Sequence, residues 1–416
     1  MTVSTSTRLL PMLLPTEYAS FRGDVLSELC GHVECLKTSL RRSVVLLDPM
    51  AGTAPLIPFV EFIGSTGYFN DLNTLHLFVN RARTVAAYKA FNAVGPDSLL
   101  QALMKATASL SRLQRRPTDK WIDEQTLPRL LAAWHRLADF QPSPTYLLRA
   151  LFLLSIRSFA SYTTSSNPTW LKPGGLRSGA PRREVFNRAL SKLQRYYSAA
   201  QRYYFPAYEN QTSAKGGRVV LSNVDAASYR TKTPVDIIVT SPPFCNRVDW
   251  RRLYGPEGYF LEALGLCPKH EYLGTTAVRG YDDSESRLLA LTDISPYLGR
   301  FLIEVRKTQI HGERSSDYYV KYFVRYFDGL FTAFDQAISN LRRGHGRFLF
   351  VVQDNAHRGQ GIRIHTALTE YFSCRGFTVS SGGKERPRHH LGLRNVSRKH
   401  PMVSPRQTES IWLAER

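Results

Sequence analysis

The sequence predicts an α/β fold in which helices cover both faces of an open sheet. Two apolar runs, 44–47 and 235–240, each end abruptly at a polar loop, and helix-like segments separate them along the chain. Short runs rich in Val, Ile and Leu indicate buried strands, and longer periodic segments indicate helices. The 416 residues are 43% hydrophobic, which is enough for one large or two ordinary domains with real cores.

The first strand runs into a tight loop of small residues. Asp48 ends the strand, Pro49 follows, and Ala51, Gly52 and Thr53 let the backbone approach a ligand closely. The next segment is expected to begin a helix, whose N-terminus would favour a carboxylate or phosphate. The loop therefore predicts a ligand-binding turn between a strand and a helix.

The next expected strand, 67–70, ends at Asp71. A carboxylate at this point of an open α/β sheet suits a ribose diol, as in dinucleotide sites. The order of strand, loop, helix, strand and acid therefore predicts a site for a ligand that carries a ribose. Three further strands are predicted, over 217–225, 346–355 and 409–414.

The strand over 235–240 ends on Ser241, Pro242, Pro243 and Phe244. Because proline cannot donate a ladder hydrogen bond, the strand must stop there and the loop is stiff. Its carbonyls and the serine hydroxyl can accept hydrogen bonds, and the phenylalanine offers an aromatic face. An exocyclic amino group on a nucleobase needs such acceptors and a ring to stack on. A simple strand-terminating turn has the same pattern, so both interpretations stay open for this motif alone.

These segments together resemble the S-adenosylmethionine-dependent DNA amino-methyltransferases, which methylate cytosine N4 or adenine N6. The run Asp48-Pro49-Met50-Ala51-Gly52-Thr53 is similar to the family's cofactor loop, and Thr240-Ser241-Pro242-Pro243-Phe244 is similar to its catalytic loop. The Ser-Pro-Pro-aromatic version is associated mainly with cytosine-N4 enzymes. Ala54 departs from the pattern, because the family usually has a glycine there and alanine disfavours positive φ.

The resemblance covers roughly 1–85 and 215–416, and it implies a Rossmann-like methyltransferase sheet with S-adenosylmethionine as cofactor and double-stranded DNA as partner. Ser241 and the Pro242 carbonyl would accept hydrogen bonds from the target amino group, and Asp225 would contact the cofactor adenine. The catalytic residues that it implies are Ser241, Pro242, Pro243 and Phe244. The cofactor-binding residues are Asp48, Pro49, Ala51, Gly52, Thr53, Asp71 and Asp225.

A segment of different character separates the two motifs. Apolar runs at 99–106, 127–134 and 146–154 predict helices, 165–175 predicts an exposed loop, and 182–208 predicts a longer helix. The family that the chain resembles usually places target recognition between the cofactor loop and the catalytic loop. The resemblance therefore implies that 84–214 is a mainly helical insertion for target recognition. It would lie between a cofactor-binding half, 1–83, and a catalytic half, 215–416.

The net charge of +21, from 55 Lys and Arg against 34 Asp and Glu, favours a polyanionic partner such as nucleic acid. The helix over 182–208 interleaves arginines with tyrosines, which suits phosphate contacts and stacking, but an amphipathic helix with its aromatics packed inward has the same pattern. A basic stretch over 384–400 predicts a phosphate-contacting loop. The candidate nucleic-acid contacts are Asn246, Arg247, Arg195, Arg202, Arg386, Arg388 and Arg394.

Other features of the sequence bear on the cellular compartment and on the kinds of partner. No apolar run approaches the ~20 residues that span a bilayer, and the N-terminus lacks a secretory apolar region. The five cysteines have no paired metal-ligand spacing, so we expect a cytoplasmic protein with reduced thiols, no metal and no membrane partner. Cys245 follows Phe244 rather than proline, which argues against a covalent cytosine-C5 mechanism.

The expected function is site-specific DNA methylation on an exocyclic amino group, with cytosine N4 preferred. A restriction-modification or related defence setting is expected, with a cognate restriction endonuclease acting as a separate protein. Three alternatives stay open: adenine-N6 methylation of DNA, base methylation of RNA, and a catalytically inactive DNA-binding relative.

Overall fold

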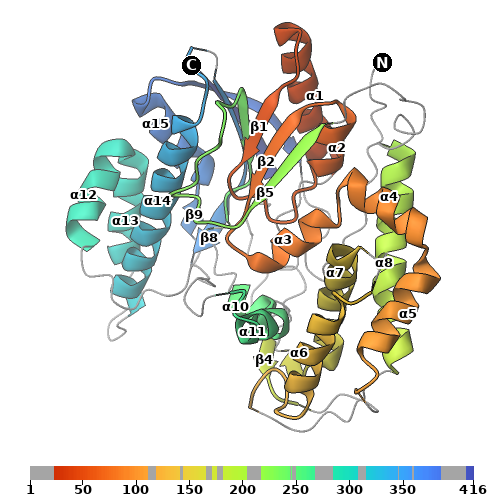
Figure 1. The fold of residues 1–416 in the computed structure, drawn as a ribbon. Helices are drawn as coiled ribbons and strands as arrows, with labels where there is room; N and C mark the ends of the chain where they lie inside the picture. Colours follow the sequence, from red (N-terminus) through yellow and green to blue (C-terminus); the bar gives the residue numbers. More distant parts are fainter. Residues whose placement is uncertain are drawn as a thin grey trace.

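A seven-stranded mixed sheet in the order β10-β11-β7-β6-β1-β2-β5 forms the centre of the molecule (Figure 1). The computed structural model describes residues 23–110, 119–140, 144–164, 171–175, 181–203, 217–243, 245, 250–267, 284–307, 315–344, 346–357, 360–385 and 409–416. The strands are β1 (Val45–Asp48), β2 (Thr66–Asn70), β5 (Arg218–Ser222), β6 (Ile237–Thr240), β7 (Arg347–Gln353), β10 (Thr378–Glu385) and β11 (Glu409–Glu415). The predicted α/β fold is confirmed, and the mostly parallel sheet is compatible with a Rossmann-like architecture.

The order in which the chain adds strands to the sheet reverses at β1. From β1 the chain adds β2 and then β5 on one side, whereas β6 and β7 extend the sheet on the other side, all parallel. β11 then runs antiparallel to both β7 and β10. In open α/β sheets, ligands bind beyond the carboxyl ends of the strands at such a reversal.

The central strands are apolar on both faces because helices cover both. Leu46 on β1 packs into one hydrophobic cluster with Ile237, on the side of α1 (Gly23–Leu40) and α2 (Ile57–Phe62). The next residue, Leu47, points the opposite way into a second cluster with Ile238. Aromatic side chains dominate that second cluster, which holds α13 (Pro296–Lys307), α14 (Ser315–Ser339) and α15 (Ile364–Cys374).

The segment predicted as a helical insertion does form helices, which lie beside and below the sheet in Figure 1. They share the first hydrophobic cluster with the sheet rather than forming a core of their own. The loop expected over 165–175 is wrong in part, because Leu171–Pro173 forms β4 and pairs with β3 (Tyr162–Thr164). The helices are α4 (Val85–Val94), α5 (Pro96–Ala106), α6 (Thr126–Arg136), α7 (Thr145–Ile156), η1 (Arg157–Phe159) and α8 (Arg182–Tyr203).

A short helix from the second half of the chain packs against these insertion helices. α11 (Gly255–Ala263) follows α10 (Trp250–Leu253) and contacts α6, α7 and α3 (Thr74–Arg81). The remaining described elements are α12 (Ser284–Ile294) and the hairpin of β8 (Asn355–His357) and β9 (Gln360–Ile362). Within the described ranges, no helix combines the length and the apolar character that crossing a membrane requires.

Candidate functional site

The two motif loops leave adjacent parallel strands at the same level. Leu47 on β1 is in register with Ile238 on β6, so the two chains enter their loops side by side. Neighbouring strands lie about 5 Å apart. The predicted cofactor loop and the predicted catalytic loop therefore begin together at the carboxyl edge of the sheet, where its strand order reverses.

Asp48, at the end of β1, has a buried side chain that accepts a hydrogen bond from the Met50 amide over 3.3 Å. Burial raises the pKa of this carboxyl to about 8, although the Thr240 hydroxyl and the Met50 amide act to lower it. Burial therefore favours the protonated form of Asp48. Its side chain fixes the start of the loop.

The loop backbone takes two left-handed conformations. Gly52 has φ +53° and Ala54 has φ +41°, and the Ala54 amide donates to the Ala51 carbonyl over 2.8 Å. The alanine thus adopts a left-handed conformation that glycine takes up readily and that alanine disfavours. A left-handed alanine costs roughly 1–2 kcal/mol, and the buried surroundings hold it there. The loop therefore carries local backbone strain at Ala54.

Asp71 closes the loop from the next strand. One carboxylate oxygen accepts from the Gly52 amide over 2.7 Å, and the other accepts from the Asn73 amide over 2.8 Å and lies 3.0 Å from His76 Nδ1. Burial acts to raise the pKa of Asp71, but His76 and the two amides outweigh it, so the pKa lies below its usual value. A carboxylate oxygen can accept two hydrogen bonds, so Asp71 keeps capacity for a hydroxyl of a ligand.

Three asparagines that the sequence analysis did not single out connect the loops. Asn70 Nδ2 donates to the Pro49 and Val224 carbonyls over 3.0 and 2.9 Å. Asn80 Nδ2 donates to the Gly52 carbonyl over 2.9 Å, and Asn223 Nδ2 donates to the Asp71 carbonyl over 2.6 Å. The only sequence signal was a polar residue, Asn70, at the end of an otherwise apolar strand.

Asp225 lies on the same edge, beyond β5, and its side chain is exposed. Its carboxylate accepts from the Ala227 amide over 2.9 Å, which fixes the turn. The preceding residue, Val224, is 43% exposed, and Leu266 is 42% exposed. The Thr74 hydroxyl lies 2.9 Å from Asn223 Oδ1 and 3.3 Å from the Leu266 carbonyl, which connects the loop before Val224 to the end of α11. This edge thus offers carboxylates beside exposed apolar surface.

The catalytic loop is described at Ser241, Pro242 and Pro243, whereas Phe244 lies outside the described residues. The hydroxyl of Tyr326, on α14, donates to the Pro243 carbonyl over 2.6 Å. Burial raises the pKa of Tyr326 well above its usual value, so this hydroxyl stays a donor. The Pro243 carbonyl is therefore engaged by the protein itself.

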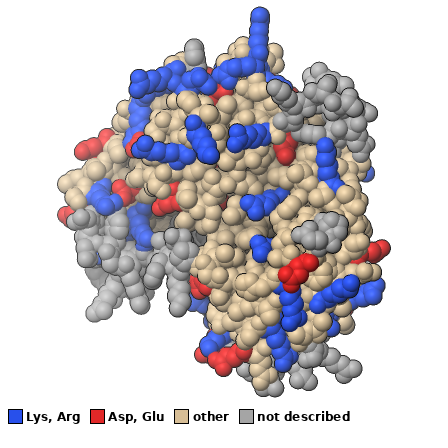
Figure 2. All heavy atoms as spheres, in the orientation of Figure 1, with Lys and Arg blue, Asp and Glu red and all other residues tan. Residues whose placement is uncertain are grey.

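The candidate nucleic-acid contacts have mixed outcomes. Arg195 and Arg202 are exposed on α8, but Tyr196 and Tyr197 are buried, and Tyr197 donates to the Ala82 carbonyl over 2.7 Å. Tyr196 and Tyr197 therefore cannot stack bases, and at these two positions the helix follows the amphipathic alternative. The side chain of Tyr203 and all of Tyr204 lie outside the described residues. Figure 2 shows Lys and Arg gathered over the upper part of the visible face. Asn246, Arg247, Arg386, Arg388 and Arg394 lie outside the described residues.

Two cavities lie away from the motif loops. One, of about 500 Å³, is at the opposite edge of the sheet beside Lys37 and Arg41. The other, of about 270 Å³, lies between the insertion and α11. Among the described residues, no group of three or more His, Cys, Asp or Glu side chains could hold a metal ion.

The fold and the site together define an α/β protein. Its candidate ligand site is built from loops at the carboxyl edge of a mostly parallel sheet. No protein-family model matches the chain, and no curated protein matches it.

Proposed function

We propose that the chain is an S-adenosylmethionine-dependent methyltransferase that acts on the exocyclic amino group of a base in double-stranded DNA, with cytosine N4 preferred. The observation that carries the proposal is the register of β1 and β6, which starts the cofactor-like loop and the Ser-Pro-Pro loop side by side. Methyl transfer needs the two loops to be adjacent, because the amino nitrogen of the base must reach the methyl group of the cofactor directly. The finer assignment of the sheet as a methyltransferase fold is part of the same proposal.

The residues at this edge fit the proposed cofactor. Asp71 is ionised and can accept from a ribose hydroxyl, and the loop around Gly52 lets the backbone approach the ligand closely. Asp225, beside the exposed Val224, offers an acceptor and an apolar surface for the adenine. S-adenosylmethionine, when bound, supplies an electrophilic methyl group on sulfur.

The catalytic loop would orient the target amino group. The Ser241 hydroxyl and the Pro242 carbonyl would be the acceptors for the two amino hydrogens, and Tyr326 holds the neighbouring Pro243 carbonyl in place. The Ser241 and Pro242 acceptors would turn the nitrogen lone pair toward the methyl group that the cofactor supplies. The methylated amine would then lose its extra proton to water, and the Ser241 hydroxyl could relay that proton by donating its own as it accepts the other. No covalent enzyme intermediate forms, and placement supplies most of the rate.

The test is transfer of a tritiated methyl group to unmethylated DNA, with total RNA in parallel, followed by nucleoside mass spectrometry. We expect N4-methylcytosine in DNA, and Ser241→Ala should lower the rate by at least 10²-fold. Ser43→Ala, at the opposite edge of the sheet, is the matched control and should keep full activity. N6-methyladenine would keep the mechanism and change the base. Label only in RNA, or DNA binding without transfer, would overturn the proposal. A cognate restriction endonuclease stays an expectation for the DNA outcome alone.

A further inference from the structure

The edge of the sheet opposite the candidate site is strongly basic. Every strand except β11 begins at this edge, and the antiparallel β11 ends there. We call it the amino edge and define it by the described segments 41–42, 63–65, 217–218, 230–236, 340–344, 346–347, 375–378 and 415–416. Each of these segments except 63–65 contains arginine or lysine, whereas their acids are Asp236 and Glu415.

The two acids do not neutralise the cations of the amino edge. Glu415 pairs with Arg347 over 2.8 Å. Asp236 is buried and accepts from Arg42 over 2.6 Å and from Arg342 over 3.0 Å, so one carboxylate is shared by two guanidinium groups. Burial acts to raise the pKa of Asp236, but the hydrogen bonds that it accepts outweigh burial, and the pKa lies below its usual value. A net positive charge therefore remains on the two arginines, which are 42% and 43% exposed.

Further cations of the amino edge have no ion pair with a described residue. Among these are Arg41, Arg230, Lys232 and Arg343, whose side chains are exposed. They belong to the loops before β1, β6 and β7, which are neighbours in the sheet, so they gather over three adjacent strands. Figure 2 shows Lys and Arg side chains over the upper part of the molecule, the end at which Figure 1 marks the C-terminus after β11.

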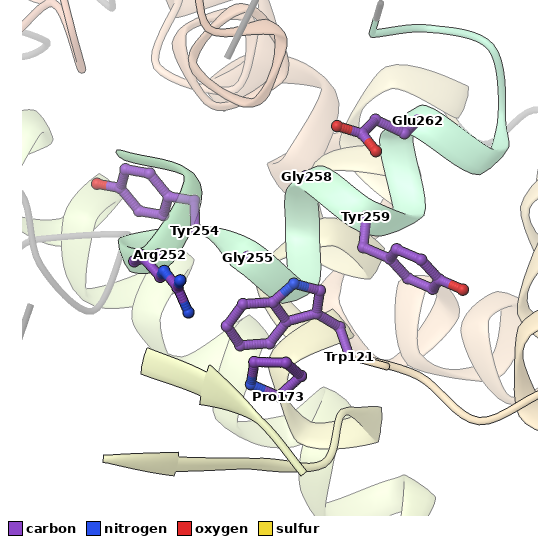
Figure 3. Close-up of a pocket in the computed structure, with 8 residues that line it drawn as sticks. All are labelled: Trp121, Pro173, Arg252, Tyr254, Gly255, Gly258, Tyr259 and Glu262. Atoms are coloured by element: carbon purple, nitrogen blue, oxygen red, sulfur yellow. The ribbon is translucent and has the colours of Figure 1, made fainter. Parts of the chain in front are cut away.

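A cavity of about 500 Å³ continues the amino edge beside α1 and α2. Its charged lining residues are Lys37, Arg41, Arg42 and the single acid Glu34. The smaller cavity at α11 has no such imbalance, because Arg252 and Glu262 give it one charge of each sign (Figure 3). A hollow that is lined mostly by one sign of charge raises the local concentration of the opposite ions, which here are anions.

The extent and composition of the amino edge favour a nucleic-acid backbone as the anion. Seven strands about 5 Å apart make an edge on the order of 30 Å long, which matches about nine base pairs of a duplex. Guanidinium groups bind phosphate oxygens through two parallel hydrogen bonds. A lipid surface would also require apolar side chains that enter the bilayer. Among the described residues, the exposed large apolar side chains lie outside the amino edge, at Val224, Leu266, Leu289 and Ile303.

We propose that the amino edge binds the phosphate backbone of a nucleic-acid duplex without reading its sequence. Arg41, Lys232 and Arg343 contact phosphates, and Arg42 and Arg342 add the charge that Asp236 leaves uncompensated. A duplex bound here does not cover the candidate site, because the two surfaces lie at opposite ends of the strands. The inference does not depend on the proposed function.

The experiment is fluorescence anisotropy of the full chain with a labelled duplex of about 20 base pairs and arbitrary sequence, repeated over a series of KCl concentrations. Each phosphate contact contributes about 0.9 to the slope of log Kd against log salt concentration. The double variant Arg41→Gln/Arg343→Gln should therefore lower the slope by up to about 1.8 and weaken binding on the order of 10-fold at low salt. The matched control Arg300→Gln/Lys307→Gln makes the same charge change on α13 and should keep the wild-type slope.

Equal slopes for the double variant and its control, at equal melting temperatures, would overturn the proposal. Vesicles that contain phosphatidylserine and a polyglutamate chain test the other polyanions. If the double variant lost binding to either of them and bound the duplex like wild type, the partner would not be a nucleic acid. Methyl transfer by the wild-type protein is measured separately. Absence of transfer, together with the expected loss of slope, would reject the proposed function and keep the amino edge.

Discussion

The hydroxyl of Tyr326 donates a hydrogen bond to the carbonyl of Pro243 over 2.6 Å, across 83 residues of sequence. This contact fixes the end of the Ser-Pro-Pro loop to the long helix α14. It also fixes the orientation of the Pro243 carbonyl, which is next in the chain to the Pro242 carbonyl proposed to accept from a substrate.

Tyr326→Phe should therefore lower the turnover of methyl transfer about 10-fold while the KM for S-adenosylmethionine stays unchanged. Removing the donor leaves a partly buried carbonyl without its partner, which costs about 1–3 kcal/mol of folding stability. Tyr322→Phe is the matched control, because its hydroxyl makes a longer bond of 3.4 Å to the Cys245 carbonyl. Equal effects of the two substitutions on turnover would contradict a positioning role for Tyr326.

Ala54→Gly should stabilise the protein by about 0.5–1 kcal/mol. The substitution relieves roughly 1–2 kcal/mol of left-handed strain at φ +41° and gives back part of it as backbone entropy in the unfolded chain. Ala90→Gly, in the middle of α4, makes the same change at a helical position and should destabilise by about 1 kcal/mol. Urea denaturation measures both, and a loss of stability in both variants would show that Ala54 is not strained.

We expect the contribution of Asp48 to the folding stability to fall as the pH rises. Its folded pKa of about 8 lies above the usual value, so the unfolded chain releases this proton first. Stability contributed by the protonated form is complete below about pH 4 and falls by up to about 1.4 kcal/mol per pH unit until the folded pKa is passed. Asp48→Asn should flatten this slope between about pH 4 and pH 8 in thermal unfolding.

The substitution Asp71→Asn tests a dependence of folding stability on pH that has the opposite sign to that of Asp48. The folded pKa of Asp71 is lowered, so its stabilisation is present above about pH 4 and is lost as the pH falls through the folded pKa. The variant should lose stability at neutral pH and show a weaker decline in acid. The same pH profile for Asp48→Asn and Asp71→Asn would disprove both assignments.

The ion pair between Arg157 and Glu257 should be the main polar connection between the insertion and α11. Arg157 Nε donates to Glu257 over 2.9 Å, and its Nη2 donates to the Leu253 carbonyl over 2.7 Å. Both side chains are largely buried, so Glu257→Gln or Arg157→Ala leaves an uncompensated group and should cost about 3–5 kcal/mol. The exposed pair of Arg188 and Glu184 is the control, since Arg188→Ala should change stability by less than about 1 kcal/mol. Calorimetry that gives similar losses at both sites would contradict this role.

Local sequence predicted the central strands because their signal is local. The runs that became β1 and β6 are apolar on both faces, and the prolines after Thr240 end the second strand wherever it packs. The local sequence did not predict β10, because Thr378–Glu385 is rich in Ser and Gly and has no alternation of apolar and polar residues. That strand pairs with β11, and a pairing partner about 30 residues away leaves no local pattern.

By itself the sequence determined the α/β class, the two motif loops and the helical nature of the segment between them. Only the tertiary structure decided that burial raises the pKa of Asp48, that Asp71 holds Gly52, and that Tyr196 and Tyr197 face the core. The physical reason is that hydrophobic period, prolines and small-residue turns act on the chain locally and can be recognised in the sequence. A residue's burial, pKa and hydrogen-bond partners come from residues that are far away in sequence and become neighbours only when the chain folds.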